Sequence, residues 1–475
     1  MKADFSTYRQ LLETTHPGLY RYSDKVDMDA RFEALDQELN QELSFYDFHK
    51  KIAGFSAQIR CGHTFVLPTK NVDDYIYQNI KTLPLYVYPI QGKLYVVFNG
   101  TTDESIKPGF ELTQINGRSV DSISTVLKQH YWADGYIDLA KNKALDGGLF
   151  GMFYYILIEQ PSEFQLTFKD LQGNKVEIKA PAQFLRETNK KFSKNPVNQK
   201  MLAYYNKNNK KPWRLSFPKE LSETAILRFD GFGGKGMDDE SSAIKAIRQF
   251  MDKSLAKIKK KKTRYLIIDV RDNGGGWDVQ GAELLSYLVQ ADTTFPYYKR
   301  LHTITDESPF LKYADLSEID LANVKKELKQ ESDGTFTMLP TGSPNILPQQ
   351  PKPNRFKGQV YILMNANSNS TTSEFVAMAQ QLKVGVFLGE EAGGAAQGGV
   401  GGSFIKYSLP NSGIYLQVPL VYYQNAVGTS LPNGRGAQPD HMVQLTIEDL
   451  LSNRKPVLDY TFNLIRAVQA IKIKY

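Results

Sequence analysis

The chain of 475 residues contains a single cysteine, Cys61, which excludes an internal disulfide. The cellular compartment stays open, because many exported bacterial proteins also lack disulfides. Apolar residues make up 41% of the chain and aromatic residues 12%, which is enough for sizeable cores. At this length we expect two or three domains.

Long apolar runs and paired metal ligands are also missing. The longest uncharged apolar-rich stretch, residues 147–158, is much shorter than the roughly 20 residues that a membrane helix needs. The six histidines are scattered along the sequence without the paired spacing of metal ligands, and the chain has no second cysteine that could complete a site. We therefore expect no integral membrane segment, no metal and no cofactor.

Positive charge is modest overall but concentrated in two places. The formal net charge is +7, and basic residues cluster in 190–214 and in 257–264. The first cluster lies in a polar, linker-like stretch, and the second is typical of the solvated end of a helix. We interpret both as solvated surface and expect no nucleic-acid partner.

The pattern of apolar residues changes twice along the chain. Residues 1–82 are mostly helical in pattern, and residues 83–185 contain short β-rich runs with an Asn-Gly turn signal at 116–117. From 186 to 475, strand-like and helix-like runs alternate, which predicts an α/β layer structure with largely parallel strands. A long insertion at 296–355 is typical of a lid, a strap or a mobile loop.

The turn at residues 367–375, between an apolar strand-like run and a helix-like run, carries several hydroxyl side chains. A serine at such a turn lies beside free backbone N–H groups at the positive end of a helix dipole. It can act as a nucleophile next to an oxyanion hole, or it can simply cap the helix. Taken alone, this segment favours the cap.

A second strand-like run ends in three glycines, Gly274, Gly275 and Gly276. The spacing fits neither the phosphate-binding loop of nucleotide hydrolases nor the dinucleotide-binding fingerprint. An oxyanion hole is the better functional interpretation, and a tight turn is the structural one.

Four segments together resemble the C-terminal processing (tail-specific) serine peptidase family. They are Asp-Val-Arg-Asp-Asn-Gly-Gly-Gly (269–276), the turn at 367–375 with Gly-Glu-Glu-Ala-Gly-Gly (389–394) after it, Gly-Ala-Gln-Pro-Asp (436–440) and Lys-Pro-Gly-Phe-Glu-Leu-Thr-Gln-Ile-Asn-Gly (107–117). They occur in the family's order and span roughly residues 60–450.

The resemblance implies an N-terminal helical region (1–82), a PDZ-like β-rich domain (83–185) and a crotonase/ClpP-like peptidase core (186–475). It implies a serine peptidase whose partner is a peptide or protein substrate, and it implies the PDZ-like domain as the site for the substrate's C-terminus. Because the family is mostly exported in bacteria, a periplasmic protein or a lipoprotein is expected. The start, MKADFSTYRQ, has no signal-peptide core, so a signal would be absent from this chain.

Two branches of the family place the catalytic base differently. In the Ser-Lys branch the lysine position corresponds to Ala395, and no lysine lies between 384 and 405. The branch resembling the tricorn core and interphotoreceptor retinoid-binding protein modules implies Ser370 as nucleophile and His63 as base. In the Ser-Lys branch the serine lies three residues before the position of Glu374, and this spacing would make Thr371 the nucleophile instead.

The same resemblance implies an oxyanion hole built from the N–H groups of Gly274 or Gly275 and Thr371. The acid that orients the histidine is not evident, because residues 431–435 contain no carboxylate. Glu391 and Asp440 are the candidates for this third member. We thus expect a serine endopeptidase, with a peptide- or ligand-binding protein on the same scaffold, or an esterase, as alternatives.

Overall fold

The computed structural model describes residues 1–206, 211–429 and 431–473. Its first segment forms three helices, α1 (Lys2–Thr15), α2 (Lys25–Glu38) and α3 (Phe45–Gln58), as the sequence predicts. Helix α3 begins where Ser44 accepts a hydrogen bond from the Asp47 backbone N–H. No helix in the described part of the chain is long and apolar enough to cross a membrane.

The β-rich unit that follows is an antiparallel sheet in the order β3-β4-β5-β7-β8, with β6 paired to β5. Asn116 and Gly117, both at positive φ, form the two-residue turn between β5 and β6. The elements are β2 (Lys81–Thr82), β3 (Leu85–Ile90), β4 (Lys93–Asn99), β5 (Glu111–Ile115), β6 (Arg118–Ser119), α5 (Val120–Gln129), α6 (Gly147–Leu157), β7 (Glu163–Lys169), β8 (Lys175–Pro181) and β9 (Gln183–Phe184). Helices α5 and α6 contribute to the apolar core beside this sheet.

The stretch that we expected to be a polar linker is helical where the structure describes it. Helices α7 (Leu185–Lys194) and α8 (Gln199–Asn206) place Phe192 and Met201 against Val97 and Phe98 of β4. These residues therefore pack with the β-rich unit, and the sheet of the core begins only at residue 213. Residues 207–210, which belong to the first basic cluster, lie outside the described residues.

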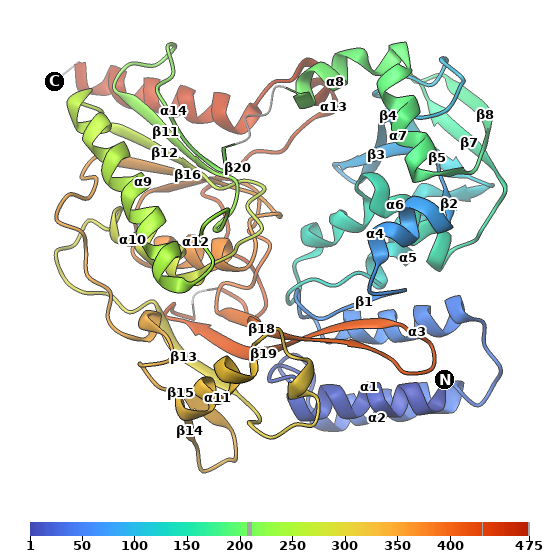
Figure 1. Cartoon of the computed structure of the whole chain (residues 1–475). Helices are drawn as coiled ribbons and strands as arrows, with labels where there is room; N and C mark the ends of the chain where they lie inside the picture. Colours follow the sequence, from blue (N-terminus) through green and yellow to red (C-terminus); the bar gives the residue numbers. More distant parts are fainter. Residues whose placement is uncertain (207–210, 430, 474–475) are drawn as a thin grey trace.

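The core is a sheet in the order β10-β11-β12-β16-β17-β20, parallel except for β10. Helices α9, α10 and α12 contribute to the cluster on one face of this sheet, and α14 contributes to the cluster on the other (Figure 1). The elements are β10 (Trp213–Ser216), β11 (Thr224–Phe229), α9 (Glu240–Lys260), β12 (Tyr265–Asp269), α10 (Asp278–Ser286), β16 (Gln359–Met364), α12 (Thr371–Gln381), β17 (Val386–Gly389), β20 (His441–Met442), α13 (Ile447–Ser452) and α14 (Pro456–Ile473). The predicted α/β layers are confirmed.

Strands β12 and β16 are parallel neighbours, with Asp269 opposite Leu363. Their carboxyl ends therefore meet at one edge of the sheet. The glycine loop leaves β12 there, and the serine-bearing turn leaves β16 there. Ligands of open α/β sheets bind at this kind of edge.

The insertion at 296–355 is more ordered than we expected. It contains β13 (Tyr298–Thr303), α11 (Glu318–Lys326), β14 (Leu328–Gln330) and β15 (Phe336–Met338), with 3₁₀ turns η4 (Leu311–Tyr313) and η5 (Pro344–Ile346). These strands join a second sheet through β13, which pairs with β15 and β19. Strands of three residues give almost no periodic signal in a sequence, which is why the segment resembled a loop.

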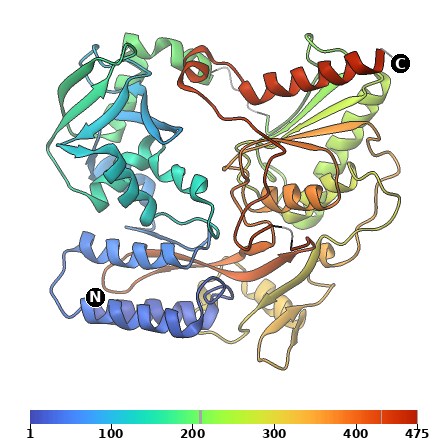
Figure 2. The same cartoon turned by 180° about the vertical axis from the view of Figure 1, so that it is seen from behind.

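A long hairpin, β18 (Gly398–Ser408) and β19 (Tyr415–Asn425), connects the core to the N-terminal helices (Figures 1 and 2). Strand β1 (Phe65–Leu67) pairs with β19. Apolar side chains of the hairpin, including Ile405 and Leu416, pack in one cluster with α1, α2 and α3. Through the hairpin, the loop that carries His63 is brought to the core. Between β1 and β2 lie the short helix α4 (Val72–Asp74) and the π-turn η1 (Tyr75–Asn79).

Candidate active site

Ser370 occupies a strained position at the start of α12. Its backbone angles are φ 53° and ψ −133°, which a residue with a side chain adopts only at a cost. Its side chain makes no cap hydrogen bond, so the helix-cap interpretation of this serine is wrong. A half-buried hydroxyl held on a strained turn between a strand and a helix is suited to nucleophilic attack.

Three neighbouring hydroxyls have other partners, and that of Thr372 is fully buried and unbonded within the described residues, out of reach of a substrate. Ser368 Oγ donates to the Val270 carbonyl at 2.8 Å, and Thr371 Oγ1 donates to the Gly276 carbonyl at 2.8 Å. Ser373 Oγ donates to the carbonyl of Ser370 itself, at 2.7 Å. Among the described residues Ser370 Oγ has no such partner, and its geometry therefore favours it over Thr371 as nucleophile.

The glycine loop lies directly against this serine. A Cβ on Gly275 would come within 2.7 Å of Ser370 Cβ and 3.1 Å of the Thr371 nitrogen. The Gly275 N–H donates to Asn273 Oδ1 at 2.9 Å, so it is already occupied. The N–H groups of Gly274 and Thr371 have no hydrogen-bond acceptor in the described part of the chain, and they are the better pair of oxyanion donors.

Two adjacent glycines provide a matched test of this contact. We expect Gly275→Ala to lower kcat by about 100-fold, because the new methyl group collides with the nucleophile and the backbone is at φ 105°. Gly274→Ala places its methyl group in open space and should change kcat by less than about threefold, since the backbone N–H is retained. Steady-state kinetics of both variants measure the difference, and equal losses would contradict the assigned contact.

His63 lies in the loop between α3 and β1, beside the hairpin. Its ring centroid is 5.7 Å from that of Phe404, and its carbonyl accepts a hydrogen bond from Gln417 Nε2. Nδ1 is buried without a partner, whereas Nε2 is neither fully buried nor hydrogen-bonded within the described residues. The next residue, Thr64, is held by His16 Nε2 at 2.7 Å. The ring therefore presents Nε2 outward, as a general base requires.

A buried polar cluster lies between the serine turn and His63. Glu374, on the first turn of α12, accepts a hydrogen bond from Tyr298 at 2.5 Å, and the ring of Tyr298 lies 6.0 Å from that of Tyr423. Tyr423 Cε1 and His63 Cε1 lie 3.3 and 3.5 Å from the position that a Cβ of Gly401 would occupy. Among the described residues no hydrogen bond joins Ser370 Oγ to His63. Catalytic hydrogen bonds often tighten only when substrate binds.

Burial raises the pKa of Glu374 to about 8, and the negative charge of Asp278 adds to the shift, although hydrogen bonds from Tyr298 and Tyr423 oppose it. The folded protein thus holds this proton more tightly than the unfolded chain, whose carboxyl titrates near its ordinary pKa of 4.5. The resulting stabilisation is complete below pH 4.5 and is lost as the pH rises through about 8.

Glu374→Gln should therefore flatten the pH dependence of stability. We expect the Tm of the wild type to fall, relative to that of the variant, between pH 5 and pH 9, because only the wild type must ionise a buried group. Thermal unfolding at several pH values measures this difference. Parallel Tm curves for the two proteins would show that Glu374 does not titrate in this range.

Both candidates for the third member have partners of their own. Glu391 accepts hydrogen bonds from Arg435 Nε and Nη2 at 2.8 and 2.6 Å, and from the Gly436 N–H at 2.9 Å. Asp440 Oδ2 accepts from the Phe387 N–H at 2.8 Å. Neither carboxylate has a hydrogen bond to His63 in the described part of the chain. Ala395, the position of a lysine base in the other branch, is buried and bridged to Gly436.

Asparagines shape the site in a way that the sequence pattern did not single out. Asn273 Oδ1 holds the Gly275 N–H, and the Asn273 carbonyl accepts from Asn369. Asn369 Oδ1 in turn accepts from the Ser370 N–H at 2.8 Å. The sequence signal for this role was the position of an asparagine directly before Gly274 and before Ser370, because Asn side chains hydrogen-bond to nearby backbone groups in turns.

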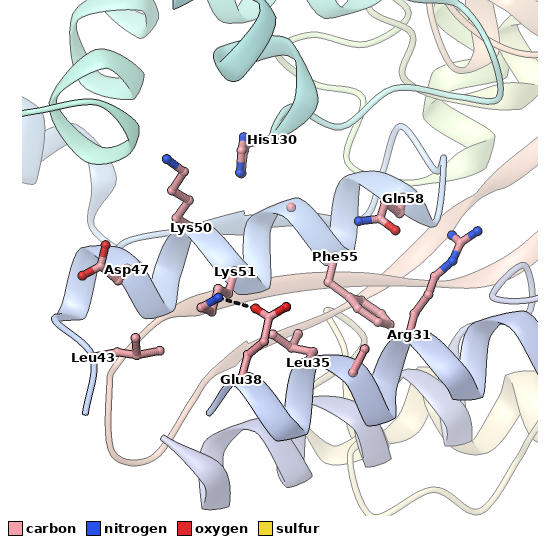
Figure 3. A pocket seen from close by; sticks show the side chains of 12 residues that line it. Arg31, Leu35, Glu38, Leu43, Asp47, Lys50, Lys51, Phe55, Gln58 and His130 are labelled. Atoms are coloured by element: carbon pink, nitrogen blue, oxygen red, sulfur yellow. Dashed lines mark hydrogen bonds and ion pairs between the residues drawn. The ribbon is translucent and has the colours of Figure 1, made fainter. Parts of the chain in front are cut away.

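Two hollows lie outside the serine turn. An open one of about 500 Å³ lies between α2, α3 and His130, with Arg31, Lys50 and Lys51 along its wall (Figure 3). No residue of the serine turn or glycine loop lines it, so it is separate from this site. A mainly apolar hollow of about 70 Å³ is lined by Leu311, Leu316, Leu321, Val324, Leu328, Met338, Ser403 and Val421, among others. Ser403 precedes Phe404, the ring beside His63.

A parallel α/β sheet with a strained serine and unpaired backbone N–H groups at its carboxyl edge has the arrangement of an acyl-transfer enzyme. Residues 223–443, a little less than half of the chain, match the model of peptidase family S41. The resemblance to C-terminal processing serine peptidases is thereby confirmed, and the protein is a hydrolase of the peptidase class.

Structures of CPAF share the fold over nearly the whole chain, and two other solved structures match it with lower TM-scores. Mature CPAF complexed with lactacystin is 15% identical and has a TM-score of 0.62, with 98% of each chain covered. A putative S41 protease from Bacteroides fragilis NCTC 9343 is 11% identical (TM-score 0.42, 97% of each chain). The photosystem II D1 C-terminal processing protease is 12% identical (TM-score 0.40, 95% of this chain and 96% of that one). No curated protein sequence matches this chain.

Proposed function

We propose that the protein is a serine endopeptidase that cleaves extended peptide segments, with Ser370 as nucleophile and His63 as general base. The observation that carries the proposal is the strained, unbonded Ser370, which lies against Gly275 of the glycine loop. The unpaired N–H groups of Gly274 and Thr371 adjoin these two residues in the sequence. A peptide is the expected substrate because the family consists of peptidases.

The reaction follows from these positions. His63 Nε2 takes the proton from Ser370 Oγ while the oxygen attacks the peptide carbonyl carbon. The N–H groups of Gly274 and Thr371 stabilise the resulting oxyanion. The imidazolium then gives its proton to the leaving amine, and a water molecule hydrolyses the acyl-enzyme with His63 again as base.

The β-rich unit is proposed to be a PDZ-like module that binds the substrate C-terminus by strand addition. A hollow of about 120 Å³ supports this role, because Tyr88, Ile90 and Lys143 of that unit line it together with Asn365 and Asn367, where the chain enters the serine turn. A peptide held there would lie close to the nucleophile. The core sheet is proposed to be of the crotonase/ClpP type, and export to the periplasm, including as a lipoprotein, is proposed from the family's usual setting.

A non-catalytic binding protein on the same scaffold is the second candidate, favoured by the missing hydrogen bond between Ser370 and His63. Incubation of the purified protein with casein and with tailed peptides separates the two. The peptidase proposal predicts new N-termini and turnover, and faster amide than ester cleavage would set it apart from an esterase. Tight peptide binding without any cleaved product would overturn it.

A further inference from the structure

A buried carboxylate from the β-rich unit lies beside the loop that carries His63. Asp134, in the segment after α5, is only 2% exposed. Its Oδ1 accepts a hydrogen bond from the N–H of Gly62, the residue before His63, at 2.6 Å. A Cβ on Gly62 would lie 3.2 Å from the same oxygen, so the glycine leaves space for the carboxylate.

Two buried polar atoms near this contact have no partner. Asp134 Oδ2 and His63 Nδ1 are both buried and unbonded within the described residues. A buried polar atom left without a hydrogen bond is destabilising, and native structures satisfy more than about 90% of such atoms. An unpaired acceptor and an unpaired ring nitrogen in the same region form a complementary pair.

Both atoms face the same stretch of β18. Asp134 Oδ2 lies 3.3 Å from the position that a Cβ of Gly399 would occupy, and His63 Nδ1 lies 3.6 Å from the equivalent position of Gly401. Residues two apart on a strand point to the same face, about 7 Å apart. The two atoms therefore share one side of the strand, where a direct contact or one bridging water molecule can join them. The small glycines leave room for both polar side chains.

The segment around Asp134 also packs against residues 431–435, the stretch in which an orienting acid was expected and none is present. Gly135 packs against Gly434, and the Tyr136 N–H donates to the Gly434 carbonyl at 2.8 Å. Gly434 lies within 431–435, the stretch that contains no carboxylate. The β-rich unit thus supplies a carboxylate that is hydrogen-bonded to the His63 loop.

We propose that Asp134 is the positioning residue for His63, accepting a hydrogen bond from Nδ1–H directly or through one water molecule. This inference rests on the proposed function of His63 as general base. With Nδ1 protonated, the lone pair of Nε2 is available to take the serine proton, and the carboxylate stabilises the imidazolium that forms. Glu374 and Tyr423 are the other titratable groups near this point. The Tyr423 hydroxyl lies beside the same glycine as Asp134, 2.6 Å from the Cβ position of Gly399, and neither group has a hydrogen bond to Nδ1 among the described residues.

The tautomer of His63 tests the proposal in the intact wild-type protein. In protein labelled with ¹⁵N-histidine, with the His63 signals assigned by their loss in His63→Gln, the neutral ring should carry its proton on Nδ1. In Asp134→Asn, which keeps an oxygen for the Gly62 N–H, the proton should move largely to Nε2. An Nε2–H tautomer in the wild type, or an unchanged tautomer in the variant, would overturn the proposal.

Kinetics then separate positioning from folding and from the proposed function. We expect Asp134→Asn to lower kcat by about 100-fold or more with KM within threefold, and Asp134→Glu to recover part of the loss. A variant with wild-type kcat in an active enzyme would refute the role of Asp134 and leave the peptidase assignment intact. A wild-type protein without turnover would refute the peptidase assignment, while the tautomer measurement still reports on the Asp134–His63 contact.

Discussion

Ser370→Ala is expected to lower kcat/KM for peptide cleavage by about 10⁴-fold or more, with KM little changed. The alanine keeps the backbone and the oxyanion donors of Gly274 and Thr371 but removes the oxygen that is proposed to attack. The variant should fold normally, because the Ser370 hydroxyl makes no hydrogen bond within the described residues. Hydrolysis of a fluorogenic peptide, followed over hours, measures the loss.

Two neighbouring hydroxyls provide the controls. Ser373→Ala removes a hydroxyl that donates to the Ser370 carbonyl, and Thr371→Val removes one that donates to the Gly276 carbonyl. Each loses one hydrogen bond and no reacting atom, so each should retain activity within about tenfold. If Thr371→Val were inactive and Ser370→Ala active, Thr371 would be the nucleophile.

His63→Gln is expected to lower kcat/KM by a similar factor, about 10³-fold or more, because glutamine cannot take the serine proton. The double variant Ser370→Ala/His63→Gln should be no worse than either single variant, since the two residues act as one unit. Peptide hydrolysis by the three proteins measures this non-additivity.

His441→Gln is the matched control for His63, because His441 contacts Tyr460 at the edge of the core sheet and has no role in the proposed reaction. It should keep wild-type activity. Losses in the double variant that equal the product of the two single losses would show that Ser370 and His63 act independently.

The core and the serine turn could be predicted because their signals are local. Strands such as β12 and β16 are continuous apolar runs, and the glycine loop and the serine turn follow them directly in the sequence. The strained φ of Ser370 was not visible in this way, since it depends on contact with Gly275 from another turn. The segment alone favoured a helix cap, but the Ser370 side chain makes no cap hydrogen bond.

The relation between His63 and Ser370 could not be derived from spacing, because it depends on the hairpin of β18 and β19. Strand β18 begins with glycines at 398, 399, 401 and 402, and glycine has a low preference for strands. The same glycines leave room for Tyr423, His63 and Asp134. Asp134 lies in a different unit from the serine, and no local pattern marks an isolated acid in a loop as a partner of a distant histidine.

The site of covalent modification by a fluorophosphonate tests the assignment of the nucleophile most directly. The wild-type protein should gain one phosphonyl group, and peptide mapping by mass spectrometry should place it on Ser370. Ser370→Ala should gain none, and His63→Gln should react far more slowly. An adduct on Thr371 or on another serine, or no adduct on a protein that cleaves peptides, would contradict the mechanism built on Ser370.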